Sequence, residues 1–354
     1  MCVKFDYLRW FAAASVLAGM MFGGLLSNAA SYNGQYYVPL AEFARANGFH
    51  IYAPREGEDV LMNKNNLRLV FDVNSAESQI GGVNVRLSYP VAGDHGELLV
   101  SQLDIDTALR PLIYAQKPNS RRITTICLDP GHGGIDTGNR VVGFLTHNEK
   151  TYTLALGLEL KRQLTLAGFH VIMTRTKDVY VHLADRPALA NRDGADLFIS
   201  LHFNAVGEKA VAGPQTYCIT PVGATSSNSH GENSEFGSSV GTGPTEANRC
   251  EDKSLLLAYQ VEKSLVQNLD ADDQGVKRAR FAVLRDATMP SILIEGGFMT
   301  NPLEGKKIYS AEYRRQMAAA IVKGVLAYQK LTAPPFHRPG NGSGEEHRTS
   351  NAGR

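Results

Sequence analysis

Residues 123–134 read ITTICLDPGHGG, an apolar run from Ile123 to Leu128 that is followed by a turn with three glycines and His132. The apolar run predicts a buried strand, and the glycines after it permit a tight turn. His132 is therefore placed just past the carboxyl end of a strand, where ligand sites form in open α/β sheets. This stretch predicts both a fold class and the position of a site.

The same arrangement recurs further along the chain. Residues 196–202 (DLFISLH) and 291–295 (SILIE) are apolar runs that end in His202 and Glu295. Residues 149–167 carry apolar side chains on one helical face and are followed by glycine. Buried strands that alternate with helices predict an α/β fold, with a largely parallel, mixed sheet flanked by helices.

Polar groups at three strand ends indicate a metal site. Packing alone explains His132, His202 and Glu295 poorly, because a buried imidazole or carboxylate needs a partner, and a metal ion supplies one. Two histidines and one carboxylate with an open fourth position are the ligands of a hydrolytic zinc site. Glu149 opens the helix after the His132 turn and is the expected oxygen ligand, with His147 as a rival. Glu295 then remains to handle protons.

A smaller unit is expected before this α/β region. The 354 residues favour about two domains. Residues 31–114 contain a helical pattern at 40–48 and strand patterns at 60–62, 67–71 and 83–87, which predict a small α+β module. The sequence of this module contains no cluster of histidines, cysteines or carboxylates, so we expect it to be non-catalytic. A polar linker at 115–122 separates it from a catalytic domain at 123–331.

The N-terminal residues 1–30 predict a signal peptide. Lys4 and Arg9 precede an apolar run at 10–26, and small residues follow at 27–30. Cleavage is favoured over an uncleaved membrane anchor, because no basic stop-transfer cluster follows the apolar run. We therefore expect export to the periplasm or cell envelope.

Two further segments are polar. Residues 332–354 are rich in proline and glycine and are expected to be disordered. A polar insertion at 221–252 lies close to Cys218 and includes Cys250, which in an exported protein form either a disulfide or two free thiols. Such an insertion is the expected place for control by an inhibitory helix or by a regulatory envelope protein.

The charge balance excludes one class of partner. Lysine and arginine total 36 against 35 aspartates and glutamates, which leaves a formal net charge of +1. Binding to a phosphate backbone relies on a basic surplus that this chain lacks. We expect no nucleic-acid partner.

Short sequence blocks occur in a fixed order along the second half of the chain. They are LDPGHGG (128–134), NEK (148–150), TRTKD (174–178), LADR (183–186), AN (190–191), ADLFISLHFNA (195–205), GVKR (275–278), FAVLR (281–285) and IEGGFMTN (294–301). In these blocks residues 124–331 resemble the zinc-dependent N-acetylmuramoyl-L-alanine amidases of the Amidase_3 type. By that resemblance His132, Glu149 and His202 are the ligands of one Zn²⁺, and Glu295 is the catalytic carboxylate.

The resemblance implies a peptidoglycan hydrolase. Its members cut the amide bond between the lactyl group of N-acetylmuramic acid and the L-alanine of the stem peptide. Glu295 would act as general base and then as general acid. Arg278 and Arg285 are candidates for pairing with stem-peptide carboxylates, unless they belong to a solvated basic face, and Asn204 is a further substrate-binding candidate. We expect peptidoglycan as the partner and a monomeric protein.

Two alternatives remain at this point. The chain could be a zinc amidase or peptidase that acts on a different amide, or a catalytically silent wall-binding protein. Analysis of the products from digested peptidoglycan would separate them. The module at 31–114 resembles the small domain at the N-terminus of copper amine oxidases, which occurs on many envelope proteins and does not imply copper.

Overall fold

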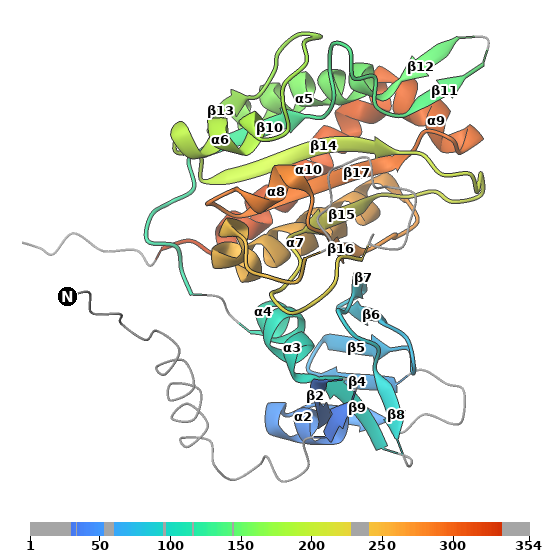
Figure 1. The fold of residues 1–354 in the computed structure, drawn as a ribbon, viewed down its shortest axis with the longest axis vertical. Coiled ribbons are helices and arrows are strands. Elements are labelled where there is room, and N and C mark those ends of the chain that lie inside the picture. Colours follow the sequence, from blue (N-terminus) through green and yellow to red (C-terminus); the bar gives the residue numbers. More distant parts are fainter. Residues whose placement is uncertain are drawn as a thin grey trace, which may run out of the picture.

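The computed structural model describes residues 30–32, 34–52, 60–94, 97–114, 117–143, 145–227 and 241–334. The predicted signal, apart from Ala30, lies outside the described residues, as do the tail from residue 335 onward and residues 228–240 of the polar insertion. Figure 1 shows a larger lobe, coloured green to red, above a smaller lobe in blue and cyan. We call residues 31–114 the N-terminal unit and residues 123–331 the C-terminal unit.

The C-terminal unit alternates strands and helices. Its strands are β10 (Thr125–Pro130), β11 (Arg140–Val142), β12 (Thr146–Asn148), β13 (His170–Met173), β14 (Leu197–Asn204), β15 (Gln215–Cys218), β16 (Val276–Arg278) and β17 (Ser291–Phe298). Its helices are α5 (Glu149–Leu166), α6 (Asp185–Arg192), the 3-10 helix η4 (Glu246–Cys250), α7 (Glu251–Leu269), α8 (Ala282–Arg285), α9 (Pro302–Tyr309) and α10 (Ala311–Leu331).

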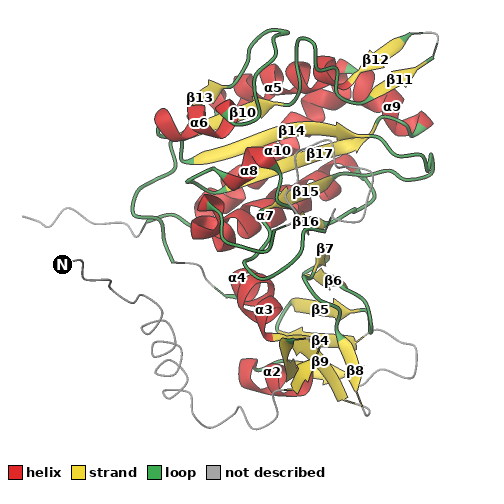
Figure 2. Cartoon of the chain, in the orientation of Figure 1, coloured by secondary structure: helices red, strands yellow, loops and turns green. Residues whose placement is uncertain are grey.

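The pairing of these strands confirms the predicted fold class. β13, β10, β14 and β17 are parallel neighbours in that order. β15 runs antiparallel to β17, and β16 runs parallel to β15, which makes the sheet mixed. Figure 2 shows helices packed around the strands of this unit. The strands that carry His202 and Glu295 extend two and three residues beyond them, so both residues lie near the strand ends rather than at them.

Alternation along the strands decides which face carries the polar groups. In β14, Ile199 and Leu201 join a large core that includes residues of α5, α7 and α10. Phe198 joins a smaller core with residues of α6 and α8. Because alternate residues of a strand point to opposite faces, His202 projects on the same face as Phe198. Glu295 of β17 projects on this face by the same alternation, in step with Leu293.

The N-terminal unit contains the helix and the strands predicted for it. Its strands are β1 (Ala30–Tyr32), β2 (Gln35–Pro39), β3 (His50–Tyr52), β4 (Val60–Lys64), β5 (Leu67–Phe71), β6 (Glu77–Ile80), β7 (Val83–Arg86), β8 (Ala92–Asp94) and β9 (Glu97–Ser101). Its helical segments are α2 (Leu40–Asn47), α3 (Gln102–Asp104), the π-helical η2 (Ile105–Leu109) and α4 (Arg110–Ile113). Gly48 ends α2 in the left-handed conformation.

The two units share a sheet. β7 pairs in parallel with β16 through Val85 and Val276. Within the described residues the sheet therefore runs β13-β10-β14-β17-β15-β16-β7-β6-β5-β4-β3, across both units. The Tyr259 hydroxyl of α7 donates a hydrogen bond of 2.9 Å to the Ile80 carbonyl. The N-terminal unit is thus packed onto the C-terminal unit rather than only tethered to it.

Asp273 makes a second connection between the units. Its carboxylate accepts a 2.7 Å hydrogen bond from the backbone N–H of Asn84, and its carbonyl accepts one of 2.8 Å from the Asn84 side chain. Asp273 also lies near the buried carboxyl of Glu262 in α7, and its negative charge raises the pKa of that carboxyl. These contacts hold the end of β6–β7 against the turn that precedes β16.

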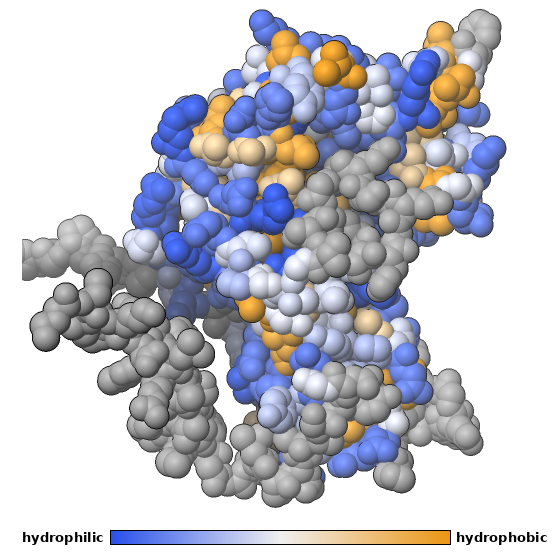
Figure 3. Space-filling view, in the orientation of Figure 1, coloured by the Kyte–Doolittle hydropathy of each residue, from blue (hydrophilic) through white to orange (hydrophobic). Residues whose placement is uncertain are grey.

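The face of the molecule drawn in Figure 3 is largely hydrophilic, with separate small hydrophobic patches. None of the helices in the described part of the chain has the length and apolarity that crossing a membrane requires. Cys218 and Cys250 are free thiols, as in the second of the two alternatives given above.

Candidate metal centre

His132 is held in the turn that follows β10. Its backbone has φ +60°, a left-handed conformation that residues other than glycine rarely adopt, and Gly133 and Gly134 after it also have positive φ. Gly133 and Asp136 exchange backbone hydrogen bonds of 2.9 and 3.2 Å, which close the turn. A non-glycine residue kept in such a conformation is typical of a functional site.

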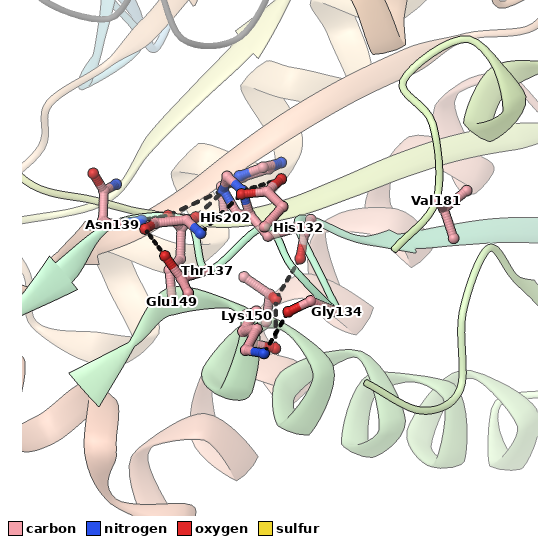
Figure 4. A network of polar contacts seen from close by, with 12 residues as sticks. His132, Gly134, Thr137, Asn139, Glu149, Lys150, Val181 and His202 are labelled. Carbon is pink, nitrogen blue, oxygen red and sulfur yellow. Dashed lines mark hydrogen bonds and ion pairs between the residues drawn. The ribbon is translucent and has the colours of Figure 1, made fainter. Parts of the chain in front are cut away.

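Glu149 lies between the two histidines. Its Oε2 is 3.1 Å from His132 Nε2, and its Oε1 is 3.0 Å from His202 Nδ1. One ligand atom from each of these three residues lies within 4.8 Å of the others. Figure 4 shows the three side chains brought together from the turn after β10, the start of α5 and β14. The structure thus gathers the three residues that the sequence analysis selected as ligands.

Charge within this group favours a cation. Burial acts to lower the pKa of His132, but Glu149 and Asp136 outweigh burial and raise that pKa to about 10. Burial likewise opposes ionisation of Glu149, but His132 and His202 outweigh it and hold the pKa of this carboxyl well below its ordinary value. A positive charge is therefore stable beside Glu149, and a metal cation supplies one when it displaces the proton.

Two glycines make room for the centre. A Cβ at Gly131 would lie 2.2 Å from the His202 ring. A Cβ at Gly138 would lie 2.5 Å from His132 Cδ2 and 2.7 Å from Glu149 Oε2. Because these positions are glycines, no Cβ crowds the two imidazoles and the carboxylate. Two imidazoles and one carboxylate are the ligands of a zinc site, so the residues present fit a zinc ion.

Backbone and side-chain contacts orient each of these groups. Asp136 places its two carboxylate oxygens 2.9 and 3.0 Å from His132 Nδ1. Glu149 accepts hydrogen bonds from the backbone N–H of Asn139 at 2.8 Å and of Phe203 at 3.0 Å. Carboxylates that bond the far nitrogen of a ligand histidine commonly fix its orientation. The sequence analysis missed Asp136, although its position four residues after His132 in the same turn was a usable signal.

Two buried arginines hold the backbone of the turn that carries His132. Arg175 donates to the carbonyls of Pro130 and Gly131, each at 2.8 Å. Arg186 pairs with buried Asp129 at 2.7 Å and donates to the His132 carbonyl at 3.1 Å. Because these guanidiniums bond main-chain oxygens, they fix the backbone that carries His132.

Glu295 lies beside the histidine of the neighbouring strand. It is the register partner of His202 across the β14–β17 ladder. Its side chain is 3% exposed, and its Oε2 is buried without a hydrogen-bond donor among the described residues. Burial raises the pKa of Glu295 well above its ordinary value, and the negative charge of Glu149 raises it further. These surroundings therefore favour the protonated form of Glu295.

A pocket of about 560 Å³ opens beside the histidines. Its lining consists of His132, Ile135, Asp136, Tyr180, His182, Leu183, Arg186, His202 and Val283. Among these described residues the one strongly basic group is Arg186, whose guanidinium is occupied by Asp129. The remaining wall is largely apolar, so this pocket suits an uncharged part of a substrate.

The expected substrate-binding residues have different outcomes. Arg278 is 4% exposed, and its Nη2 donates to the Thr107 carbonyl of the N-terminal unit. This side chain therefore lies at the junction of the units and is not among the residues that line the pocket beside the histidines. Arg285 lines a separate pocket with Gly241 and Arg280. Asn204 is buried at the end of β14, where its Oδ1 accepts a hydrogen bond from the N–H of the next residue.

The rival ligand His147 is held elsewhere. Its ring stacks on Tyr309 with 3.7 Å between the ring centres, and its Nδ1 is hydrogen-bonded to the Tyr152 hydroxyl. It is not part of the group formed by His132, Glu149 and His202.

Comparison with known proteins gives one family. The model of the family described as N-acetylmuramoyl-L-alanine amidase matches residues 126–327. The chain is 37% identical over 225 residues to N-acetylmuramoyl-L-alanine amidase AmiC of Neisseria meningitidis, covering 59% of this chain and 53% of that protein. It is 30% identical over 231 residues to N-acetylmuramoyl-L-alanine amidase AmiA of Escherichia coli, covering 60% and 78%.

A solved structure is also similar to part of the chain. It is N-acetylmuramoyl-L-alanine amidase from Clostridium difficile 630, with 31% identity and a TM-score of 0.47, covering 59% of this chain and 98% of that one. The chain thus spans about half the length of the Neisseria relative and nearly all of the clostridial one.

Proposed function

The chain belongs to the N-acetylmuramoyl-L-alanine amidase family, and on this basis we propose that it hydrolyses the amide bond between the lactyl group of N-acetylmuramic acid and the L-alanine of the stem peptide. The observation that carries the proposal is the buried His132–Glu149–His202 group with Glu295 beside it in register. This arrangement supplies both a cation site and a proton acceptor at the end of the sheet where ligands bind.

We assign His132, Glu149 and His202 as ligands of one Zn²⁺. When bound, this ion supplies a Lewis acid that makes water more acidic and polarises the scissile carbonyl. Asp136 orients the ring of His132, and the N–H groups of Asn139 and Phe203 hold the carboxylate of Glu149. These contacts keep the ligand atoms in place before substrate arrives.

Glu295 carries the proton transfers in this proposal. It accepts a proton from the attacking water and later returns it to the leaving L-alanine nitrogen. Its burial supports this role, because a carboxyl that readily keeps a proton in the fold also serves as the acid of the second step. General acid–base transfer of this kind contributes about 10²- to 10⁴-fold to the rate.

The pocket supports the choice of substrate. Ile135, Leu183 and Val283 give it an apolar wall. Next to the scissile bond the proposed substrate presents a lactyl methyl group and the alanine methyl group, both uncharged. Arg285 remains a candidate for a stem-peptide carboxylate, since it lies on the same short helix, α8, as Val283 of the pocket wall.

Mass spectrometry of the soluble products from purified peptidoglycan tests the proposed function. We expect free stem peptides with an unmodified L-alanine amino terminus and glycan strands that keep their lactyl carboxyl groups. Products cut at another amide, or no products, would show that the proposal is wrong. We further propose that the chain acts in the cell envelope after export, as the sequence at 1–30 indicates.

A further inference from the structure

A second pocket lies at the junction of the two units, apart from the metal centre. Its volume is about 430 Å³, and α7 of the C-terminal unit forms one wall with Tyr259 and Lys263. The opposite wall comes from the N-terminal unit and includes Phe49, Lys64 and Asn65. The metal centre uses none of these side chains.

The pocket is positively charged. Lys64 and Lys263 supply two ammonium groups, and none of the described residues that line the pocket is acidic. Neither ammonium group forms an ion pair with any residue in the described part of the chain. Each instead lies over an aromatic ring: Lys64 Nζ is 5.8 Å from the centre of Phe49, and Lys263 Nζ is 5.9 Å from that of Tyr259. Two such cations in one concavity attract anions.

This charge is local rather than general. The whole chain has a formal net charge of +1, so no bulk basic field holds it on an acidic polymer. A pocket with two ammonium groups that form no ion pair with the described residues is a specific contact of the kind that such a chain needs.

The junction holds the pocket in a fixed shape. Tyr259 bonds the Ile80 carbonyl across the units, and a Cβ on the adjacent Gly81 would lie 2.7 Å from the Tyr259 hydroxyl. Gly81 also has φ +57°, a backbone conformation that favours glycine. Because both walls are fixed before binding, a ligand does not have to order them.

The lining suits a peptide that carries carboxylates. Tyr114, which is 41% exposed, offers aromatic surface for aliphatic segments, and the amides of Asn65 and Asn66 can hydrogen-bond peptide groups. We propose that this junction pocket is a second wall-binding site, which takes the carboxylate-bearing stem peptide of uncut peptidoglycan. The identity of the polymer rests on the proposed function, whereas the preference for a peptide carboxylate rests on the pocket.

Two sites on one chain have a direct consequence for binding. A polymer segment held at the junction raises the effective concentration of neighbouring stem peptides at the metal centre. Loss of the junction site should therefore weaken binding to intact wall without changing the hydrolysis of small soluble fragments.

The first test measures binding to purified sacculi by co-sedimentation. The full-length chain is used with Glu295→Gln, so that turnover does not consume the wall. Adding Lys64→Gln and Lys263→Gln should raise the dissociation constant about tenfold or more, because charge-assisted contacts are lost. Lys306→Gln with Lys330→Gln, on exposed surfaces of α9 and α10, removes the same charge and should change little. Equal binding by the two double variants would overturn the proposal.

A second pair of variants separates charge from folding. Lys64→Arg with Lys263→Arg keeps both positive charges and should recover part of the binding that the glutamine pair loses, since arginine differs from lysine in shape but not in charge. Failure of this restoration in a protein with unchanged melting temperature would count against a charged pocket.

The ligand class is tested with free stem peptide. Isothermal titration should show binding of the free-acid peptide that is lost when its carboxyl groups are converted to amides. Equal binding of both peptides would overturn the carboxylate. Sacculi stripped of phosphate-bearing polymers by acid should bind as well as untreated sacculi, and lost binding would assign the pocket to a phosphate polymer instead.

One further measurement distinguishes this proposal from the proposed function. With Glu295 intact, the Lys64→Gln/Lys263→Gln chain should cut a soluble muropeptide at the parent rate. If neither chain cuts it, the proposed function fails, while the binding comparisons still decide the junction site.

Discussion

His202 and Glu295 are direct partners in the parallel ladder between β14 and β17, so their side chains leave the same face of the sheet next to each other. Each follows an apolar strand core, and alternation aims both toward α6 and α8. A histidine of the His132–Glu149–His202 group and a buried carboxyl group are therefore placed side by side by the pairing of these two strands. Because the two groups belong to different residues, metal binding and proton transfer can be tested by separate mutations.

Glu295→Gln should keep the metal and lose activity. The amide has the same shape but cannot accept the water proton, so peptide release from purified sacculi should fall about 10²- to 10⁴-fold. Glu208→Gln, an exposed change in the loop after β14, serves as the control and should be near normal. A near-normal rate for Glu295→Gln would remove the proton-transfer role.

His132→Ala should lose the metal. Removing one of three ligand side chains leaves an incomplete site, and elemental analysis should fall from about one zinc per chain to a small fraction. His147→Ala offers a matched comparison, because its ring is stacked on Tyr309 outside the group and its loss should leave zinc content unchanged. Full zinc occupancy in His132→Ala would refute the ligand assignment.

Asp136→Asn should weaken metal binding without abolishing it. The carboxylate holds His132 Nδ1 from two oxygens, and loss of such an orienting group typically lowers metal affinity about 10- to 100-fold. Competition with a chromophoric chelator measures this directly. An unchanged affinity would mean that the turn alone orients the ring.

Gly131→Ala should disturb the His132–Glu149–His202 group by crowding the His202 ring. The added Cβ would lie 2.2 Å from the His202 ring, and overpacking of this kind commonly costs about 1–3 kcal/mol. We expect a lower melting temperature together with reduced zinc content. Gly207→Ala is the control, since a Cβ there meets nothing within 4 Å. Equal behaviour of the two variants would contradict the close packing.

Stability should fall as pH rises, because of the carboxyl pair at the junction. Burial raises the pKa of Glu262 well above its ordinary value, Asp273 raises it further, and burial also raises the pKa of Asp273. The folded state thus keeps a proton that the unfolded chain releases above about pH 4.3. The contribution of this protonated pair to the free energy of unfolding is therefore lost as pH rises toward the folded pKa.

Glu262→Gln tests that dependence. The amide remains neutral at every pH, so the melting temperature of this variant should decline less between pH 5 and pH 8 than that of the parent. Parallel curves would show that the pair does not control the pH dependence.

Much of the centre could be predicted because its residues carry local signals. His132 and Glu295 follow apolar runs, and Glu149 opens a helix. Arg278 carried no such signal, since its partner Thr107 lies 171 residues earlier in the chain. Its basic side chain in the segment before Glu295 suggests a substrate contact, whereas tertiary packing uses it to join the two units.

In the fold, too, elements with a clear local pattern could be predicted and those that depend on tertiary pairing could not. The helix at 40–48 and the strand at 67–71 follow clear patterns and are present. β6 (ESQI) has three polar residues and was not predicted, although its neighbours pair with it. The junction of β7 and β16 was also missed, because a three-residue strand that pairs through Val85 and Val276 leaves little trace in the sequence.

The shared sheet has a consequence for anyone who divides this protein. Without the N-terminal unit, β16 would present its unpaired N–H and C=O groups to solvent as a template for another chain. An excised C-terminal unit would then tend to self-associate through that open edge. By pairing with β16, the N-terminal unit therefore also protects the C-terminal unit against aggregation.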